Sequence, residues 1–202
     1  TVNIDLTSST KYVAMAFPFD ANIPQGLKVY ECPKIVGGTA YLKPVTNIVA
    51  YTPYMVFADN EFHGELTGTL SAEKYDAKVA TDGTISEGCL RGTVLPTDIN
   101  NAYILNGDKA FTKSQKTHVE AGQCWLASDA GAQRIPFDTP KFKIKYIADG
   151  KVYVEQSVCY GDSIHLPDGP HKEGHTFVSW GKTDIIMPDK DLEYNAEFKT
   201  NK

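Results

Sequence analysis

Cysteine is scarce in this sequence, and its spacing excludes two classes of site. The 202 residues include only 4 Cys, too small a share for a domain held together mainly by disulfides. They are Cys32, Cys89, Cys124 and Cys159. Because they stand far apart, they form no C-x-x-C pair of a redox or zinc site. The sequence leaves open whether Cys32, Cys89 and Cys124 form a disulfide.

An excess of positive charge is also missing. The chain has 20 Lys and Arg against 25 Asp and Glu, a net charge of −5 with histidine neutral. Proteins that bind nucleic acids concentrate Lys and Arg to neutralise phosphates. We therefore expect no nucleic-acid partner.

Long hydrophobic runs do not occur. No stretch approaches the roughly 18 to 20 apolar residues that a membrane-spanning helix needs, so we expect no transmembrane segment in this chain. Residue 1 is Thr, and no basic and then apolar leader follows it. We expect that a signal peptide has been removed or that the chain begins inside a longer protein.

Motifs for catalysis and for cofactor binding are absent as well. The sequence contains no G-x-S-x-G elbow and no glycine-rich phosphate loop. His171 and His175 stand four residues apart, but the neighbouring Pro and Gly disfavour the helix that would bring them together. The pair Glu61 and Glu65 fits surface solubility better than a glycosidase or calcium site. We predict no enzymatic activity, no cofactor and no metal.

Short alternating segments dominate what is present. Val2, Ile4 and Leu6 alternate with polar residues, which is the pattern of a half-buried strand. Similar runs follow, separated by turn-forming residues every 8 to 12 positions or so. Only residues 71–80 approach a helical pattern, and that segment is short. The pattern predicts an all-β fold, a sandwich or barrel, and we favour a sandwich.

Two prolines mark a connector. Pro136 and Pro140 disfavour helix and supply no backbone N–H to a ladder. We therefore expect two domains, an all-β sandwich over residues 1–138 and a smaller, mostly β module over residues 141–202.

The second domain carries an ordered set of motifs. They are Y-G-D at 160–162, P-x-K-E-G-x-T-F-x-x-W at 170–180 and M-P-x-x-D at 187–191. In their order and spacing they resemble the Listeria–Bacteroides repeat, also called the internalin B-repeat, which implies a small β-grasp-like fold. The segment departs from the family at His175, where an aromatic is usual, and at Cys159, where a Lys or similar residue is usual.

The first domain resembles an all-β module of Bacteroides-type surface proteins. The segments that carry this resemblance are 50–56, 66–69, 90–93, 103–107 and 119–126. Together the two resemblances imply a bacterial protein that is secreted or displayed at the cell surface, with modules typical of stalks and adhesins. They imply no reaction.

Aromatic residues are the feature that points to binding. The chain has 11 Tyr, 9 Phe and 2 Trp, and several gather in two groups. The groups are Tyr12, Phe17, Phe19 and Tyr30, and Tyr51, Tyr54, Phe57 and Phe62. Exposed aromatics serve sugar stacking or protein contact, although the same residues also suit pleated strand surfaces. From the second group we predict Tyr51, Tyr54 and Phe62 as ligand contacts.

The resulting functional hypothesis is a non-catalytic surface module that acts in adhesion, in ligand binding or in spacing other domains. Its partner would be a glycan or a host or cell-surface protein. The alternative is a carbohydrate-binding accessory module of a secreted glycan-processing protein. The sequence does not decide the oligomeric state.

Strand alternation also makes predictions for single side chains. Trp180 should fill the small core of the second domain. Cys124 should point inward beside an outward or edge Trp125, and Cys159 should point outward. We expect no disulfide at Cys159 within the chain, because the other cysteines belong to the first domain.

Overall fold

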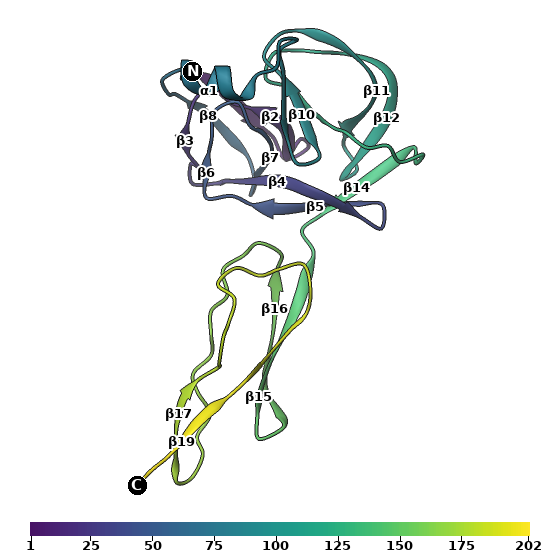
Figure 1. Ribbon diagram of the computed structural model, residues 1–202. Helices are drawn as coiled ribbons and strands as arrows, with labels where there is room; N and C mark the ends of the chain where they lie inside the picture. The colour runs from purple at the N-terminus through teal and green to yellow at the C-terminus, as the bar shows by residue number, and fades with distance from the viewer. The chain divides into compact units, whose positions relative to one another are not determined.

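The computed structural model describes all 202 residues, and almost all of its regular structure is strand. It contains nineteen strands and one seven-residue helix, α1 (Ala72–Lys78). The all-β class predicted from the alternation is thereby confirmed. No helix in the chain has the length and apolar character needed to cross a membrane. The chain divides into two compact units, Thr1–Asp138 and Thr139–Lys202 (Figure 1).

The first unit holds α1 and fourteen strands. These are β1 (Val2–Leu6), β2 (Tyr12–Ala16), β3 (Ala21–Asn22), β4 (Leu27–Val36), β5 (Thr39–Pro44), β6 (Asn47–Ile48), β7 (Pro53–Ala58), β8 (Phe62–Leu66), β9 (Thr84–Glu87), β10 (Leu90–Thr93), β11 (Thr97–Asn106), β12 (Ala110–Val119), β13 (Cys124–Leu126) and β14 (Arg134–Asp138). Ten of them form one sheet in the order β2-β7-β4-β5-β14-β12-β11-β13-β10-β9. Neighbours in this sheet run antiparallel, except for the parallel pair β14 and β5.

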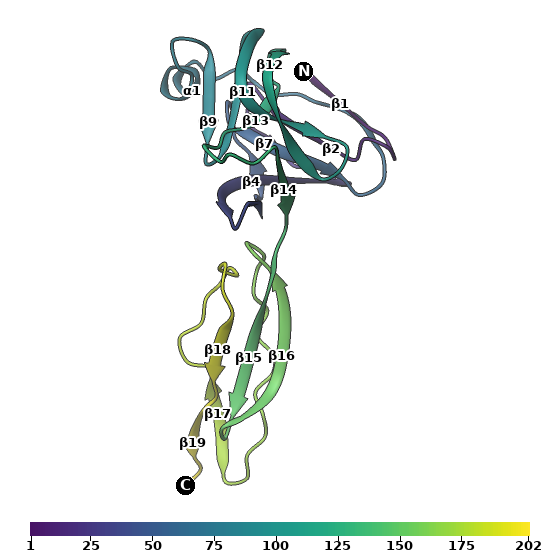
Figure 2. The same cartoon turned by 90° about the vertical axis from the view of Figure 1, so that its right-hand side faces the viewer.

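This large sheet curls until its edge strand β2 meets the segment that precedes β13. Met15 is bridged to Gln123, and the Ala16 N–H donates a hydrogen bond of 2.8 Å to the Gly122 carbonyl. The right-handed twist of successive strands brings such distant parts of a long sheet together. The expected sandwich therefore takes the form of one curled sheet with smaller ribbons packed on it (Figure 2).

Strand β7 is buried on both faces. Met55 belongs to the inner core of the curled sheet, whereas Tyr54 and Val56 belong to a second core outside it. The antiparallel ribbon of β1 and β8 contributes Ile4 and Leu6 to this outer core. Fully burying an aliphatic side chain of this kind contributes about 1.5–3 kcal/mol. The ribbon is thus held against the sheet chiefly by apolar contact.

Helix α1 depends on its cap and on one ion pair. The Ser71 side chain caps it by accepting a hydrogen bond of 3.2 Å from the Lys74 N–H. None of its residues is buried, and a helix this short is unstable alone. The Lys74 ammonium bonds the Asp20 carboxylate at 2.5 and 2.7 Å, which ties the helix to the loop after β2.

The second unit holds five strands. They are β15 (Lys141–Ala148), β16 (Lys151–Cys159), β17 (His175–Ser179), β18 (Leu192–Asn195) and β19 (Glu197–Thr200). Strand β15 lies between the antiparallel β16 and the parallel β18, and β17 pairs with β19.

Aromatic side chains form the core of this unit. Trp180 is 3% exposed and packs with Tyr146 and Tyr194. Its indole N–H donates a 2.9 Å hydrogen bond to the Pro167 carbonyl. The prediction that Trp180 fills this small core is confirmed.

Two of the predictions for single side chains around β13 differ in outcome. Cys124 is buried as predicted. The outward or edge position predicted for Trp125 is wrong, because β13 lies inside the sheet, between β11 and β10, and this side chain is only 7% exposed. It packs with Ala102 and Val119 of the long β11–β12 hairpin, which gives that face of the sheet a small core of its own. Strand alternation shows which residues share a face, but not which faces become covered.

Candidate ligand pocket along strand β2

Strand β2 is an edge strand of the large sheet. Its ladder partner is β7, with Tyr12 opposite Phe57 and Ala16 opposite Pro53. Its other side has no neighbouring strand in the sheet order, but its C-terminal end meets the segment before β13 through the bridge between Met15 and Gln123 and the hydrogen bond from Ala16 to Gly122. An edge of this kind is a natural place for another chain to add a strand.

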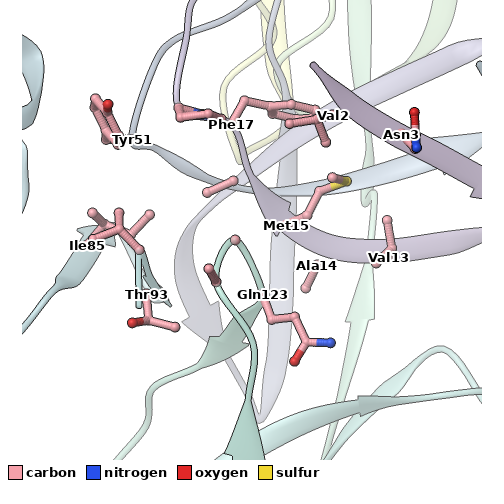
Figure 3. Close-up of a pocket in the computed structure, with 15 residues that line it drawn as sticks. Val2, Asn3, Val13, Ala14, Met15, Phe17, Tyr51, Ile85, Thr93 and Gln123 are labelled. Carbon is pink, nitrogen blue, oxygen red and sulfur yellow. The ribbon is translucent and has the colours of Figure 1, made fainter. Parts of the chain in front are cut away.

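A pocket of about 450 Å³ follows this edge (Figure 3). Its volume lies within the range of roughly 300 to 1,000 Å³ that is typical of ligand sites. The lining residues come from β1, β2, β9, β10 and the loops beside them. They are Val2, Asn3, Val13, Ala14, Met15, Ala16, Phe17, Pro18, Tyr51, Ile85, Thr93, Val94, Ala121, Gly122 and Gln123.

Residues from both faces of β2 line the pocket. Val13 and Met15 lie on the face toward the outer core, whereas Ala14 and Ala16 lie on the face toward the inner core. Successive side chains of a strand point to opposite faces. A pocket that touches both sets therefore runs along the backbone edge of β2, and not over one face of the sheet.

Tyr51 forms one side of the pocket and has an unusual backbone conformation. Its φ is 55°, in the left-handed region that costs a residue with a side chain about 1–2 kcal/mol. Two hydrogen bonds hold this turn. The Tyr51 N–H donates to the Phe17 carbonyl at 2.7 Å, and the Ala50 N–H donates to the Asp20 carboxylate at 2.8 Å. The strain is thus compensated by contacts that fix the ring at the pocket.

Helix α1 supports the same turn from outside. The rings of Tyr75 and Tyr51 meet edge to face, with centroids 5.4 Å apart. The Lys78 ammonium donates a 2.6 Å hydrogen bond to the Thr52 hydroxyl. The hydrogen bonds from Lys74 and from Ala50 lower the pKa of the Asp20 carboxyl. Three residues of α1 therefore position the Tyr51 turn or its supporting carboxylate.

The interior of the pocket is apolar, and polar groups stand at its margin. No Asp, Glu, Lys, Arg or His lines it. The Thr93 hydroxyl is buried and donates to the Leu95 carbonyl at 2.6 Å, so its proton is used within the protein. Asn3 and Gln123 are exposed and lie on different sides of the pocket in Figure 3. The pocket can bury apolar groups and offer amide hydrogen bonds, and the phenol of Tyr51 is the one ionisable side chain that lines it.

The structure brings one of the three predicted contact residues into this pocket. Tyr51 lines it. Tyr54 is 3% exposed in the outer core, and its hydroxyl accepts a 3.1 Å hydrogen bond from the Val49 N–H. Burial raises the pKa of this phenol. Phe62 is half-buried on β8 and packs against the same core. Of the three, only Tyr51 lines the pocket, and its side chain is itself 7% exposed as part of the inner core.

Sequence reasoning did not select the aliphatic part of the site. Val13 and Met15 lie in the short apolar run 12–17, one of those that predict strands, but nothing in this run marks its strand as an edge. Phe17 was noted in the first aromatic group and not chosen. The available signal was the proline that follows it, Pro18, because proline tends to occur at sheet edges and strand ends.

Elsewhere, titratable groups form small ion pairs and hydrogen bonds on the surface. His63 contacts Asp5 across β1 and β8, and His118 bonds Asp98 at 2.8 Å across β11 and β12. Hydrogen bonds from His118 and Lys116 lower the pKa of Asp98. No group of three or more His, Cys, Asp or Glu side chains in the chain is placed to hold a metal ion.

Comparison with known proteins identifies part of the chain. Residues 142–201 match the family model of the Listeria-Bacteroides repeat domain. This match spans β15 to β19 and confirms the resemblance of the second unit. No curated protein matches the chain. The resemblance of residues 1–138 to a surface module remains a prediction.

Proposed function

We propose that the protein is a non-catalytic module of the bacterial cell surface, and that its first unit binds an extended segment of another protein. The observation that carries this proposal is the apolar pocket beside the edge strand β2, which has no neighbouring strand over its first half. The matched repeat in the second unit supports the surface setting.

An extended peptide suits this site because it offers two kinds of contact at once. Its backbone can hydrogen-bond to an edge strand, while its alternate side chains enter pockets beside that strand. Val13 and Met15 line one side of the β2 edge, and Ala14 lines the other. A single added strand would place apolar side chains on both sides.

The second unit is better suited to spacing than to binding. Tyr146, Trp180 and Tyr194 are all buried in its core. A module of about 60 residues buries only about 60% of its unfolded surface, so it needs these aromatics for its own stability. The first unit has a larger core, and Tyr51 belongs to that core with 7% of its surface exposed while also lining the pocket.

A glycan fits the pocket less well. Sugars need many hydrogen-bonding groups beside an aromatic face, whereas this interior is apolar and its exposed amides, Asn3 and Gln123, stand at the margin. Glycan binding, which would make the protein a carbohydrate-binding accessory module, is therefore an outcome that the test must distinguish.

The test uses the full 202-residue chain with both a displayed random-peptide library and a glycan array. We expect enriched peptides with alternating apolar residues, and we expect Tyr51→Ala to reduce their binding at least tenfold. Phe62→Ala, which removes an aromatic outside the pocket, is the matched control and should retain binding. Enrichment of glycans alone, or peptide binding that depends on Phe62 and not on Tyr51, would contradict the proposal.

A further inference from the structure

Two cysteines of the first unit lie against each other. Cys32 is on β4 and is fully buried, while Cys89 is in the turn between β9 and β10 and is partly buried. The Cys89 N–H donates a hydrogen bond of 2.8 Å to the Cys32 carbonyl. Both side chains belong to the inner core or pack against it. Both cysteines therefore contribute to the same core.

The backbone hydrogen bond limits the distance between the Cα atoms of the two cysteines. With standard bond lengths on either side of the hydrogen bond, their Cα atoms are at most about 6.7 Å apart. Disulfides join Cα atoms that are roughly 4.4 to 6.8 Å apart. Burial, and after it the neighbouring Cys89 thiol, raise the pKa of the Cys32 thiol. No large movement of the backbone is needed to join them.

Gly88 permits this close approach. Its φ is 53°, and a Cβ atom placed on it would lie 2.4 Å from the Cys32 carbonyl oxygen. A side chain at this position would push the turn away from β4. The turn that carries Cys89 is thus shaped by a residue that lets its backbone touch the strand that carries Cys32.

The other two cysteines have different surroundings. The Cys124 thiol is buried on β13 and faces the Gly122 carbonyl at 3.8 Å. Cys159 belongs to the second unit. Neither has a backbone hydrogen bond to another cysteine among the contacts between strands and turns.

We propose that Cys32 and Cys89 form a disulfide when the protein meets an oxidising disulfide donor. The Cys89 thiolate, the more accessible of the two, attacks one sulfur of a small external disulfide, and one small thiolate leaves. The Cys32 thiol then loses its proton, its sulfur attacks the sulfur of Cys89, and the second small thiolate leaves. Two protein thiols are oxidised, one external disulfide is reduced to two thiols, and the two protons pass to the released thiolates.

This bond would join parts of the sheet that are distant in its strand order. Strand β4 is third in that order, whereas β9 and β10 are at the opposite end. The crosslink would therefore span the interior of the curled sheet and fix β9 and β10 against β4. Ile85 on β9 and Thr93 on β10 line the pocket, so the same bond would hold one of its walls.

Peptide mapping tests the bond directly, because trypsin places each cysteine on its own peptide. The four peptides are 29–34, 79–91, 117–134 and 152–172. The full chain is incubated with excess oxidised glutathione, its remaining thiols are blocked after denaturation, and it is digested. We expect peptides 29–34 and 79–91 to be linked, with a loss of about 2 Da from the intact mass before blocking. Blocked thiols on both peptides, stable glutathione adducts at either one, or a link from either to another peptide would overturn the proposal.

Thermal unfolding gives the second measurement. The linked protein should unfold about 5–15 °C above the fully reduced protein. Cys89→Ser should abolish this difference, whereas Cys159→Ser should keep it. If Cys89→Ser does not fold, the wild-type protein with and without dithiothreitol decides, and equal unfolding temperatures would count against the bond.

Discussion

The ring of Tyr75 stands edge to face on the ring of Tyr51, with 5.4 Å between the centroids. Tyr75 is on a helix with no buried residue, and Tyr51 is in a turn with a left-handed backbone. Edge-to-face aromatic pairs contribute about 0.5–1.5 kcal/mol beyond the area they bury. The contact thus couples a marginal helix to a strained turn, and it does so at the pocket.

Two substitutions at Tyr51 distinguish the energetic effect of its backbone strain from that of its aromatic ring. Tyr51→Ala and Tyr51→Gly both remove the aromatic contact, but only glycine adopts a φ near 55° without steric cost. We expect the Gly variant to be more stable than the Ala variant by about 0.5–1 kcal/mol after the entropy of glycine in the unfolded chain is counted. Urea unfolding of the two proteins measures this difference, and a more stable Ala variant would show that the turn is not strained.

The Asp20 carboxylate should make stability depend on pH in the acid range. Its pKa is lowered in the folded protein, chiefly by the hydrogen bond from Lys74. A carboxyl with a lowered pKa stabilises the fold above its unfolded pKa and loses that contribution as the pH falls through the folded pKa. We expect Asp20→Asn to reduce stability at pH 7 and to flatten the loss below about pH 4.

The matched control for this prediction is Asp76→Asn, which removes another carboxylate from the same region of the surface. Because Asp20 is well exposed, the effect should be modest and should shrink at high salt. Unfolding curves at several pH values and two salt concentrations measure it. An Asp20→Asn curve parallel to wild type across the acid range would refute the role of this carboxylate.

Trp180 should decide whether the second unit folds. Trp180→Ala removes a core side chain and should cost about 3–5 kcal/mol, which is comparable with the whole stability of a module this small. We expect amide NMR signals of residues 139–202 to collapse to unfolded positions. Trp125 then remains the only tryptophan, and its emission should still report a buried indole in the first unit.

Trp180→Phe is the milder variant for the same position. It keeps an aromatic ring but loses the N–H donor to Pro167. The Pro167 carbonyl would lose a partner worth about 1 kcal/mol. The second unit should stay folded and unfold earlier than wild type. If Trp180→Ala left the NMR signals of the second unit dispersed, its core would not depend on this side chain.

Gly88 should tolerate no side chain. Gly88→Ala places a methyl group against the Cys32 carbonyl and leaves alanine at a positive φ. We expect a loss of about 2 kcal/mol or more in unfolding free energy. Gly107→Ala is the matched control, because a Cβ atom there meets nothing within 4 Å. Similar stabilities of the two variants would show that the turn can move away from β4 at little cost.

Strand alternation predicted the class of fold but not which residues form the site. Tyr51 and Tyr54 belong to one aromatic group and both are buried, yet Tyr51 packs in the inner core and lines the pocket, whereas Tyr54 packs in the outer core. The difference comes from the left-handed turn at Tyr51, which requires the hydrogen bonds to Phe17 and Asp20. Contacts between positions so far apart in the sequence cannot be inferred from local pattern.

The second limit of prediction from the sequence concerns which faces of a strand are covered by other elements. Strand β7 is almost continuously apolar, and this is typical of a strand buried on both sides. Local sequence does not show that the ribbon of β1 and β8 provides the second cover. The repeat motifs of the second unit predicted its family correctly, because the order and spacing of the motifs from Gly161 to Asp191 are those of one known module.

The last strand of the first unit bears on how the protein carries mechanical load. Strand β14 is paired on both sides, in parallel with β5 and antiparallel with β12, and Phe137 and Asp138 are still in register with Ala40 and Tyr41. Tension that enters through residue 139 along the strand would act on these ladder bonds in shear, so that several must break together. The chain should resist such a pull better at β14 than it would at a strand whose bonds open one at a time.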